Sequence, residues 1–478
     1  MYEYEEDSDI IGLSCTLQCI TGKSRECLSW RARIMQQICK KSSSMKRMVY
    51  LVACLPFWLT SCEEKVTALH FNEAEQVFEI GKESELRFLN ETFEIKDKNM
   101  EAQTLLTDAG KEIPADEVRI KLVKDIEISG EWTPIKFPVR EFDGNGHTIT
   151  FDGIRVVIEE SSKGVFDVGL FEEMGGEKEA VVKDLTLAGD MTIDAQKRED
   201  GYSLLAGSLA GEFKNGCIEN CTSKVDISFA DNKGICTLCL GGLVGDLDSY
   251  GSEVEVALRG KIINEGNLTV NPCSDAYIGG VIGRATNYGK IFIKENVCVE
   301  NKGDLTVQWK ADAQPDHSYI GGVVGLFKTN ETDIEHLHNW GNIRLDTQNT
   351  SATFNIGGVC GELTPHNYER IYPLDLYNAG NIEIKHDLLA EFSAIGGVIG
   401  SFGGSSFHQV VNEGKIIVSG KGCKYISGLL GSESSIHGNC YLHSCCVDKV
   451  GAYPVWNISY HPVTKQVPCK ENHPTNQK

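Results

Sequence analysis

From residue 119 onward, apolar and polar residues alternate over much of the chain. Between Ile120 and Ile154 this alternation is interrupted by the turn sequence DGNGHTI. Alternation places successive side chains on opposite faces of an extended strand, so it predicts strands with one buried and one exposed face. Earlier in the chain, the stretch from Glu83 to Phe93 has apolar residues at helical spacing and predicts one short helix.

A glycine-rich motif recurs within the alternating region. Its clearest form, YIGGVIG, begins at Tyr277, and further copies begin at Leu240, Tyr319, Asn355 and Ala394, with weaker ones at Ala206 and Ile426. A phosphate-binding glycine loop occurs once per domain, so seven near-regular copies indicate a repeat architecture instead. The glycines assigned to this structural repeat are Gly241, Gly242, Gly245, Gly279, Gly280, Gly283, Gly321, Gly322, Gly325, Gly357, Gly358, Gly361, Gly396, Gly397 and Gly400.

A second motif, Asn-x-Gly followed by alternating residues, lies between successive glycine motifs. Asn and Gly tolerate the left-handed backbone of a sharp corner. One repeat therefore reads as a three-sided coil of roughly 35–40 residues, and roughly eight or nine coils would stack into a rod about 40 Å long. Stacked side-chain amides can hydrogen-bond as a ladder. The predicted ladder is Asn264, Asn301, Asn339, Asn378 and Asn412.

A more specific signal precedes the repeats. The chain matches the pattern L-x-x-D-I-x-[IL]-S-G-x-x-W-x-P-I, then F-D-G-N-G-H-T-I, except that only Glu131 separates Gly130 from Trp132. The matching positions are Leu122, Asp125, Ile126, Ile128, Ser129, Gly130, Trp132, Pro134, Ile135 and Phe142 to Ile149. With the glycine repeats, this combination resembles bacterial surface proteins that carry the GLUG motif, over about residues 78–432. The resemblance implies an all-β, right-handed parallel β-helix on an extracytoplasmic protein.

Residues 45–62, MKRMVYLVACLPFWLTSC, have the form of a secretory signal. The stretch resembles the bacterial lipoprotein signal, which implies that Cys62 is lipidated and anchors the mature chain in the outer membrane. Glu63 and Glu64 resemble the surface-export signal of Bacteroidetes lipoproteins. The other interpretation is a short buried helix or a membrane anchor. Since 44 residues precede Met45, the simplest account is a start codon assigned too early.

The predicted organisation has five parts. Residues 1–44 are a wrongly assigned upstream segment, and residues 45–62 are the signal peptide. Residues 63–118 form a linker and a small helix-containing N-terminal cap, residues 119–432 form the β-helix, and residues 433–478 form an irregular C-terminal cap or tail. Solenoid ends need such caps because their outer coils would otherwise be exposed.

Charge and cysteine content limit the partners and metal sites that the chain can be expected to have. The 68 acidic residues outnumber the 46 basic ones, which argues against a nucleic-acid partner. Cys236 and Cys239 form a CxxC near Cys217 and Cys221, but alternation along a strand favours packing or a disulfide over metal binding. A disulfide-tied cap is likewise favoured for His437, Cys440, His443, Cys445, Cys446 and Cys469. We predict no metal ion and no cofactor.

These features predict a scaffold for adhesion, or for binding to a glycan or a host surface, through variable loops. The loop from Lys310 to Ser318 is one candidate; Trp309, Trp340 and Tyr288 are either aromatic contacts or packing residues. The alternative is a polysaccharide-degrading lyase or glycoside hydrolase, which needs paired carboxylates. Two or three carboxylates clustered in a groove would favour the enzyme, and a flat face with scattered charges would favour adhesion.

Overall fold

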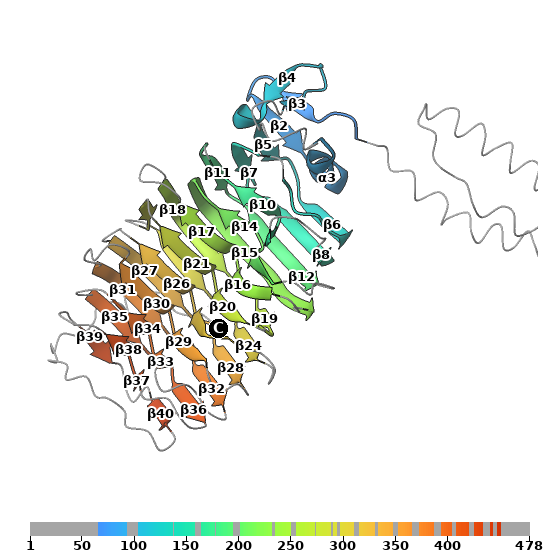
Figure 1. The fold of residues 1–478 in the computed structure, drawn as a ribbon. Helices are drawn as coiled ribbons and strands as arrows, with labels where there is room; N and C mark the ends of the chain where they lie inside the picture. The colour runs from blue at the N-terminus through green and yellow to red at the C-terminus, as the bar shows by residue number, and fades with distance from the viewer. Residues whose placement is uncertain are drawn as a thin grey trace, which may run out of the picture. The chain divides into compact units, whose positions relative to one another are not determined.

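Figure 1 shows the computed structural model of the chain. The described residues are 66–92, 104–136, 138–157, 164–176, 178–194, 201–231, 235–249, 255–272, 274–287, 290–293, 297–309, 315–329, 333–347, 352–365, 372–386, 393–403, 408–419, 425–433, 440–442 and 447–450. The chain divides into two units, Met1–Lys65 and Val66–Lys478. All described residues belong to the second unit, so the predictions for residues 1–62, including Cys62, lie outside them.

One repeat shows how the motifs build a coil. β20 (Asp275–Gly279) runs into the glycine bend, β21 (Ile282–Asn287) leaves it, β23 (Cys298–Asn301) ends at the ladder asparagine, and β24 (Leu305–Trp309) follows the Asn-x-Gly corner. Each strand pairs in parallel with its equivalent in the next coil, namely β25 (His317–Gly321), β26 (Val324–Thr329), β27 (Asp333–Asn339) and β28 (Ile343–Thr347). The fold is the predicted right-handed parallel β-helix.

Two eight-stranded sheets flank the glycine bends. The first glycine sheet ends at the bends and holds β20 and β25 with β9 (Val165–Val168), β13 (Tyr202–Ala206), β16 (Ile235–Gly241), β29 (Thr353–Gly357), β33 (Ala394–Gly396) and β37 (Tyr425–Ser427). The second glycine sheet begins after them and holds β21 and β26 with β10 (Phe171–Met174), β14 (Ala210–Phe213), β17 (Val244–Ser249), β30 (Cys360–Pro365), β34 (Ile399–Phe402) and β38 (Leu430–Glu433).

The strands on either side of the Asn-x-Gly corner belong to a third, larger sheet, which we call the corner sheet. Besides β23, β24, β27 and β28 it holds β5 (Arg119–Leu122), β6 (Ile126–Glu131), β7 (Glu141–Asp143), β8 (Thr148–Val157), β11 (Ala180–Lys183), β12 (Thr186–Asp194), β15 (Gly216–Asp231), β18 (Glu255–Asn264), β19 (Leu268–Val270), β22 (Lys290–Phe292), β31 (Tyr372–Asn378), β32 (Ile382–His386), β35 (His408–Asn412) and β36 (Ile416–Ser419). Parallel pairing continues into β39 (Cys440–Leu442) and β40 (Val447–Val450), beyond residue 432.

The interior is made of stacked aliphatic residues, one from each coil at each position. Ile278, Ile320 and Ile356 pair in register along the first glycine sheet, and none is exposed. Val281 and Val323, in the glycine bends, are also fully buried. Alternation within each strand and stacking between coils therefore form one continuous core, and the hydrophobic effect holds the coils together.

The segment predicted as an N-terminal cap precedes the first coil, and its strand β2 (Val77–Ile80) pairs in parallel with β5, so it extends the corner sheet. The segment also contains β1 (His70–Asn72), α3 (Glu83–Thr92), β3 (Thr104–Leu106), β4 (Glu112–Pro114) and the short 3₁₀ helix η3 (Ala115–Glu117). From α3, Arg87 donates hydrogen bonds to the carbonyl oxygens of Ser129 and Glu131, and Asn90 donates to that of Thr133. These bonds satisfy backbone groups at the first coil, where an open sheet edge would otherwise invite further pairing.

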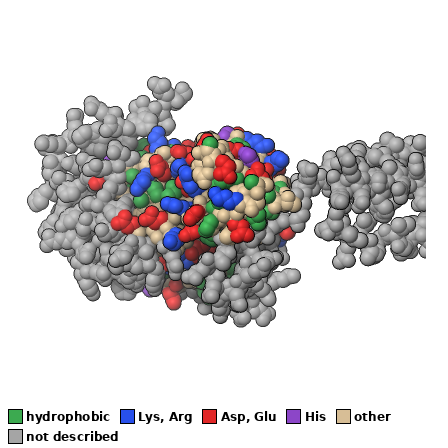
Figure 2. All heavy atoms as spheres, turned by 90° about the horizontal axis from the view of Figure 1, so that it is seen from above, with side chains coloured by type: hydrophobic (Ala, Val, Ile, Leu, Met, Phe, Trp, Pro, Cys, Tyr) green, Lys and Arg blue, Asp and Glu red, His purple; other side chains and the backbone are tan. Residues whose placement is uncertain are grey.

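Figure 2 views the molecule from above and shows acidic and basic side chains interspersed over the described surface that faces the viewer. Ion pairs occur between adjacent strands, as for Arg119 with Glu141 at 2.8 Å, and between a strand and a turn, as for Lys121 with Glu75 at 2.6 Å. Among the described residues, no helix has the length and apolar character needed to cross a bilayer.

Candidate functional site

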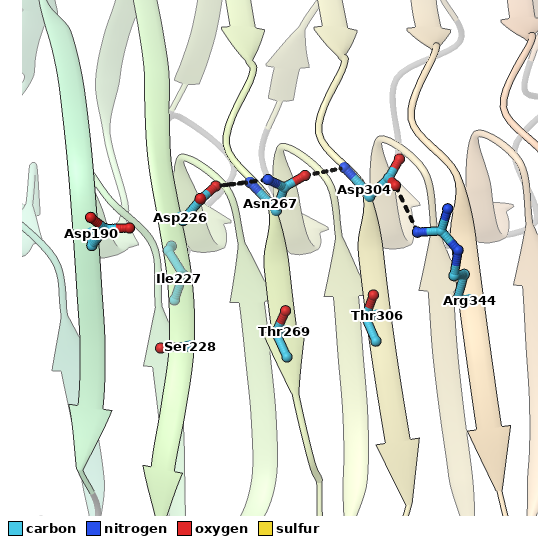
Figure 3. A pocket seen from close by; sticks show the side chains of 9 residues that line it. All are labelled: Asp190, Asp226, Ile227, Ser228, Asn267, Thr269, Asp304, Thr306 and Arg344. Atoms are coloured by element: carbon cyan, nitrogen blue, oxygen red, sulfur yellow. Dashed lines mark hydrogen bonds and ion pairs between the residues drawn. The ribbon is translucent and has the colours of Figure 1, made fainter.

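An open hollow of about 500 Å³ lies on the outer face of the corner sheet (Figure 3). Neighbouring coils contribute one to three residues each, from β12, β15, β19, β24 and β28 or from the corners just before them. Acidic, amide, hydroxyl and guanidinium groups dominate the lining, which is Asp190, Asp226, Ile227, Ser228, Asn267, Thr269, Asp304, Thr306 and Arg344.

The upper row of the hollow is a second, exposed ladder. Asp226 Oδ1 accepts hydrogen bonds from the backbone N of Asn267 at 2.6 Å and from its Nδ2 at 3.0 Å. Asn267 Oδ1 accepts from the backbone N of Asp304 at 3.0 Å, and Asp304 Oδ1 accepts from the backbone N of Asn342 at 2.8 Å. The sequence analysis missed this ladder. Its signal is the residue after the corner glycine, which is Asn or Asp in four of the five ladder repeats and Lys in NEGK at Asn412.

The lower row carries hydroxyl groups. Ser228, Thr269 and Thr306 pair in register on adjacent strands, and Arg344 continues the row. Strands in a sheet lie about 4.8 Å apart, so each of these side chains is one such step from the next. The row therefore presents hydrogen-bonding groups at regular intervals along the coil axis.

Arg344 links the two rows. Its Nη1 donates to Asp304 Oδ2 at 2.7 Å. Partial burial opposes ionisation of Asp304, but hydrogen bonds from the Asn342 backbone and from the Arg344 and Asn342 side chains outweigh it and lower the pKa of Asp304. Asp304 is therefore a carboxylate at neutral pH that can accept hydrogen bonds but cannot supply a proton. This chemistry suits binding rather than general-acid catalysis.

A separate acid cluster, formed by Asp167, Glu212, Asp246 and Asp248, lies on the two glycine sheets. Carboxylate oxygens of the last three lie within 4.8 Å of one another. Asp246 is completely buried and accepts a hydrogen bond from Arg284 Nε at 3.1 Å. Because Arg284 and Lys214 already pair with these acids, their positive charges take the place that a bound cation would need.

The pKa values of the other three members of the acid cluster are raised toward neutral pH. Burial raises the pKa of Asp167 to about 8, with a further contribution from the Glu212 charge. Burial also raises the pKa of Glu212 to about 7, against the opposing effect of Lys214, and that of Asp248 to about 6. A carboxylic acid with a pKa near 6 or 7 is suited to general-acid catalysis. The enzyme alternative was expected to show carboxylates clustered in a groove; these carboxylates are clustered, but they do not line the hollow described above.

The five predicted ladder asparagines form one buried column. The Nδ2 groups of the first four donate to the Oδ1 of the next asparagine at 2.8–2.9 Å, and that of Asn412 donates to the carbonyl oxygen of Gly428 at 2.9 Å. Each Nδ2 also donates to a carbonyl oxygen two residues later, for example from Asn301 to Gly303 at 2.8 Å. The asparagines are buried and the repeat glycines lie against backbone atoms of neighbouring coils, so both sets of residues have a structural role.

The structure divides the predicted aromatic contacts. Trp309 is 2% exposed and packs edge-on against Phe354, with ring centroids 5.0 Å apart, so it is a packing residue. Trp340 is partly buried beside Tyr377, at 4.9 Å. Tyr288 and residues 310–314 of the candidate loop lie outside the described residues. In the rest of that loop, Asp316 and His317 are exposed.

The CxxC cysteines and their two neighbours differ in burial. Cys217, Cys221, Cys236 and Cys239 are free thiols, and Cys236 is exposed whereas the other three are buried. Among the described residues, no three of these cysteines gather within ligand distance. Burial raises the pKa of Cys221 to about 12, as expected of a packing residue. The side chains of His437, Cys440, His443, Cys445, Cys446 and Cys469 lie outside the part that the structure describes.

The fold and the hollow define a β-helix repeat protein with a polar outer face. No protein-family model matches the chain, and no curated protein matches it. One similar solved structure is described as "a putative immunoglobulin A1 protease from Bacteroides ovatus". It is 15% identical, and the alignment covers 77% of this chain and 84% of that one with a TM-score of 0.38. Structural similarity at that TM-score does not indicate a shared activity.

Proposed function

We propose that the chain is a lipid-anchored surface protein whose β-helix binds a glycan in the corner-sheet hollow. The observation that carries this proposal is the pair of hydrogen-bonding rows, from Asp226 to Asp304 and from Ser228 to Arg344. Carboxylate, amide, hydroxyl and guanidinium groups all pair with sugar hydroxyls. Their repetition along the coil axis suits a linear polymer that presents similar groups at regular steps, and the ladder bonds hold the upper row in place before binding.

Binding is tested with a glycan array and the full chain. Substituting Arg344→Gln and Thr306→Val should each weaken the strongest glycan signal at least tenfold, because a lost hydrogen bond to a polar ligand costs about 1.5 kcal/mol. Gln308→Ala is the matched control, since this residue lies on the same strand as Thr306 but outside the hollow. The proposal fails if the unaltered chain binds no glycan, or if the control weakens binding as much as the two test variants.

Anchoring is a separate part of the proposal and rests on the form of residues 45–62. In cells fed a tagged fatty acid, the label should be incorporated and should disappear in Cys62→Ala. Cys236→Ala is the control because Cys236 is an exposed free thiol elsewhere in the chain. Label that persists in Cys62→Ala, or that is lost equally in the control, would reject lipidation at Cys62.

The acid cluster supports one second candidate, a polysaccharide-degrading enzyme. Glu212, with its pKa raised to about 7, would be the proton donor, and Asp248 the second carboxylate. Reducing-sugar release should be measured on the glycans that bind. Activity that falls at least a hundredfold in Glu212→Gln but not in Glu219→Gln, on the corner sheet, would favour this function. No release by the unaltered chain would exclude it for those glycans.

A further inference from the structure

Two histidines on one strand face the same side of the corner sheet. His336, Leu337 and His338 are consecutive in β27, and Leu337 is fully buried. The φ of 56° at His336 interrupts regular alternation here, and the two rings nevertheless contact the same carboxylate of the neighbouring strand. The His-x-His sequence thus brings two imidazoles to one place, and it was not singled out in the sequence analysis.

The neighbouring strand adds a carboxylate between the two rings. Leu337 pairs with Leu376 of β31, which places Asp375 beside the histidines. Asp375 Oδ2 lies 2.7 Å from His336 Nδ1 and 3.1 Å from His338 Nε2. Ligand atoms of all three residues lie within 4.8 Å of one another. Two imidazole nitrogens and one carboxylate oxygen thus converge on a single point.

The backbone explains the position of this group but not its chemistry. His336 and Asp375 both have a left-handed φ of 56°, and each lies three residues before a ladder asparagine. In earlier coils the equivalent residues are Asp184 and Asn220, each with a φ of 50°. The left-handed bulge is therefore a feature of the coil that Asp or Asn already satisfies. The backbone conformation therefore does not require a histidine at position 336, and it does not explain the second histidine at position 338.

The other edge of His338 meets a different pair of groups. Its Nδ1 is 3.9 Å from Cys298 Sγ, and Glu300 belongs to the same close group. The Cys298 thiol donates to Glu300 at 3.2 Å, and burial with the Glu300 charge raises the pKa of Cys298 to about 12. These two residues contact the Nδ1 edge of His338, on the opposite side of the ring from Asp375. His338 Nε2, 3.1 Å from Asp375 Oδ2, is the nitrogen that faces the site shared with His336.

The group is partly open to solvent. The side chains of His336, His338 and Asp375 are 35%, 7% and 17% exposed. Two histidines and one carboxylate are a ligand set that zinc accepts, with water or another molecule in the fourth position. Zinc ligands lie about 2.0–2.2 Å from the metal, so tetrahedral ligand atoms sit roughly 3.3 Å apart, a few tenths of an ångström beyond the present separations to Asp375.

We propose that His336, His338 and Asp375 bind one zinc ion, with the fourth coordination position open on the outer face of the corner sheet. This site is independent of the glycan-binding proposal. Its residues lie on β27 and β31, and none of them lines the corner-sheet hollow. It also differs from our sequence-based expectation that the chain holds no metal.

The test is zinc binding to the full chain, purified with a chelator and then dialysed against zinc chloride. We expect one zinc per chain, and an affinity at least a hundredfold lower in His336→Asn, His338→Gln and Asp375→Asn. The first and last of these keep residues that tolerate the left-handed backbone, so the fold should survive. His317→Ala is the control because this histidine is exposed on β25.

Two results would overturn the proposal. The first is less than stoichiometric zinc on the unaltered chain after dialysis. The second is zinc affinity that is unchanged in the three site variants, or that falls equally in His317→Ala. Cobalt substitution gives a second readout that does not depend on stability. Bound Co²⁺ should show the intense visible absorption of a four-coordinate site, and His338→Gln should abolish it while its far-UV circular dichroism stays that of the unaltered chain.

Discussion

Gly280 lies against the side-chain amide of Asn301, and a Cβ at residue 280 would overlap Asn301 Cγ and the carbonyl oxygen of Gly322. The same relationship holds in the neighbouring coils, between the second glycine of each motif and the ladder asparagine of its own coil. The glycine motif and the Asn-x-Gly motif are therefore one packing unit. The glycine leaves the space that the buried amide column occupies.

The coil before Asn264 shows the same rule with different residues. Here Ser208 stands at the position of the second glycine, and Ser223 pairs in register with Asn264 at the ladder position. The two hydroxyl oxygens lie 2.9 Å apart, and Ser208 also donates to the carbonyl oxygen of Gly242 at 2.6 Å. A shorter ladder residue thus accompanies a larger bend residue. Each position is limited by the volume of the other.

We expect Gly280→Ser to lower stability strongly, because its side chain must displace both Asn301 and backbone. A cost of about 3 kcal/mol is typical of overpacking in a tightly packed interior. The double variant Gly280→Ser with Asn301→Ser reproduces the Ser208 and Ser223 pair. Its loss should be smaller than the sum of the two single losses by about 1 kcal/mol or more. Urea unfolding of the four proteins measures this coupling, and purely additive losses would contradict the packing rule.

Asn339→Ala should cost about 2–4 kcal/mol of unfolding free energy. It removes the acceptor for Asn301 Nδ2 and the donors to Gly341 and Asn378, all of which are buried. The matched comparison is Asn267→Ala in the exposed ladder, where water replaces the lost partners and the cost should stay below about 1 kcal/mol. Equal shifts in the urea midpoint for the two variants would show that burial of the amide column is not what stabilises it.

Asp167 should make the protein less stable as the pH rises. Its pKa is raised to about 8 by burial and by Glu212, and the charges of Glu172 and Glu173 act in the same direction while Lys214 opposes them. Between the ordinary aspartate pKa near 4 and the folded value, the folded chain binds more protons than the unfolded chain, so stability falls with increasing pH. Its Oδ1 has no hydrogen-bond partner among the described residues.

Substituting Asp167→Asn removes this titration. We expect the variant to gain about 2 kcal/mol relative to the unaltered chain when the pH rises from 5 to 8. Unfolding should be measured at several pH values across that window, with Asp190→Asn as a control at an exposed position. A pH profile parallel to that of the unaltered chain would rule out a buried, protonated Asp167.

Removing one partner of the buried ion pair of Asp246 and Arg284 should lower the free energy of unfolding strongly. Asp246→Asn leaves the Arg284 charge without its partner, and we expect a loss of about 3–5 kcal/mol. Asp246→Asn combined with Arg284→Met should lose less than the sum of the single variants, because no unpaired charge remains. For comparison, Glu265→Gln breaks a more exposed pair with Lys302 and should cost less than about 1 kcal/mol. Thermal unfolding distinguishes these outcomes.

The sequence by itself determined the coil. Alternation marked which side chains face inward, and the recurrence of the two motifs set the length of the repeat, because a parallel stack requires equivalent residues to meet once per coil. The short cap helix was predicted at Glu83 to Phe93 and is observed at Glu83–Thr92. These features depend on the spacing of residues along the chain, which can be read directly from the sequence.

Only the tertiary structure decided which side chains meet across coils. Residues that lie next to each other in the acid cluster, such as Glu212 and Asp246, are separated by one whole repeat in the chain. Loops of variable length between strands shift the numbering, so the separation of Asp375 from His336 and His338 could not be read from spacing alone. Raised and lowered carboxyl pKa values have the same origin, since they arise from burial and from charges on neighbouring coils. The repeat in the sequence thus determines the scaffold, whereas the stacking of coils determines which chemical groups meet.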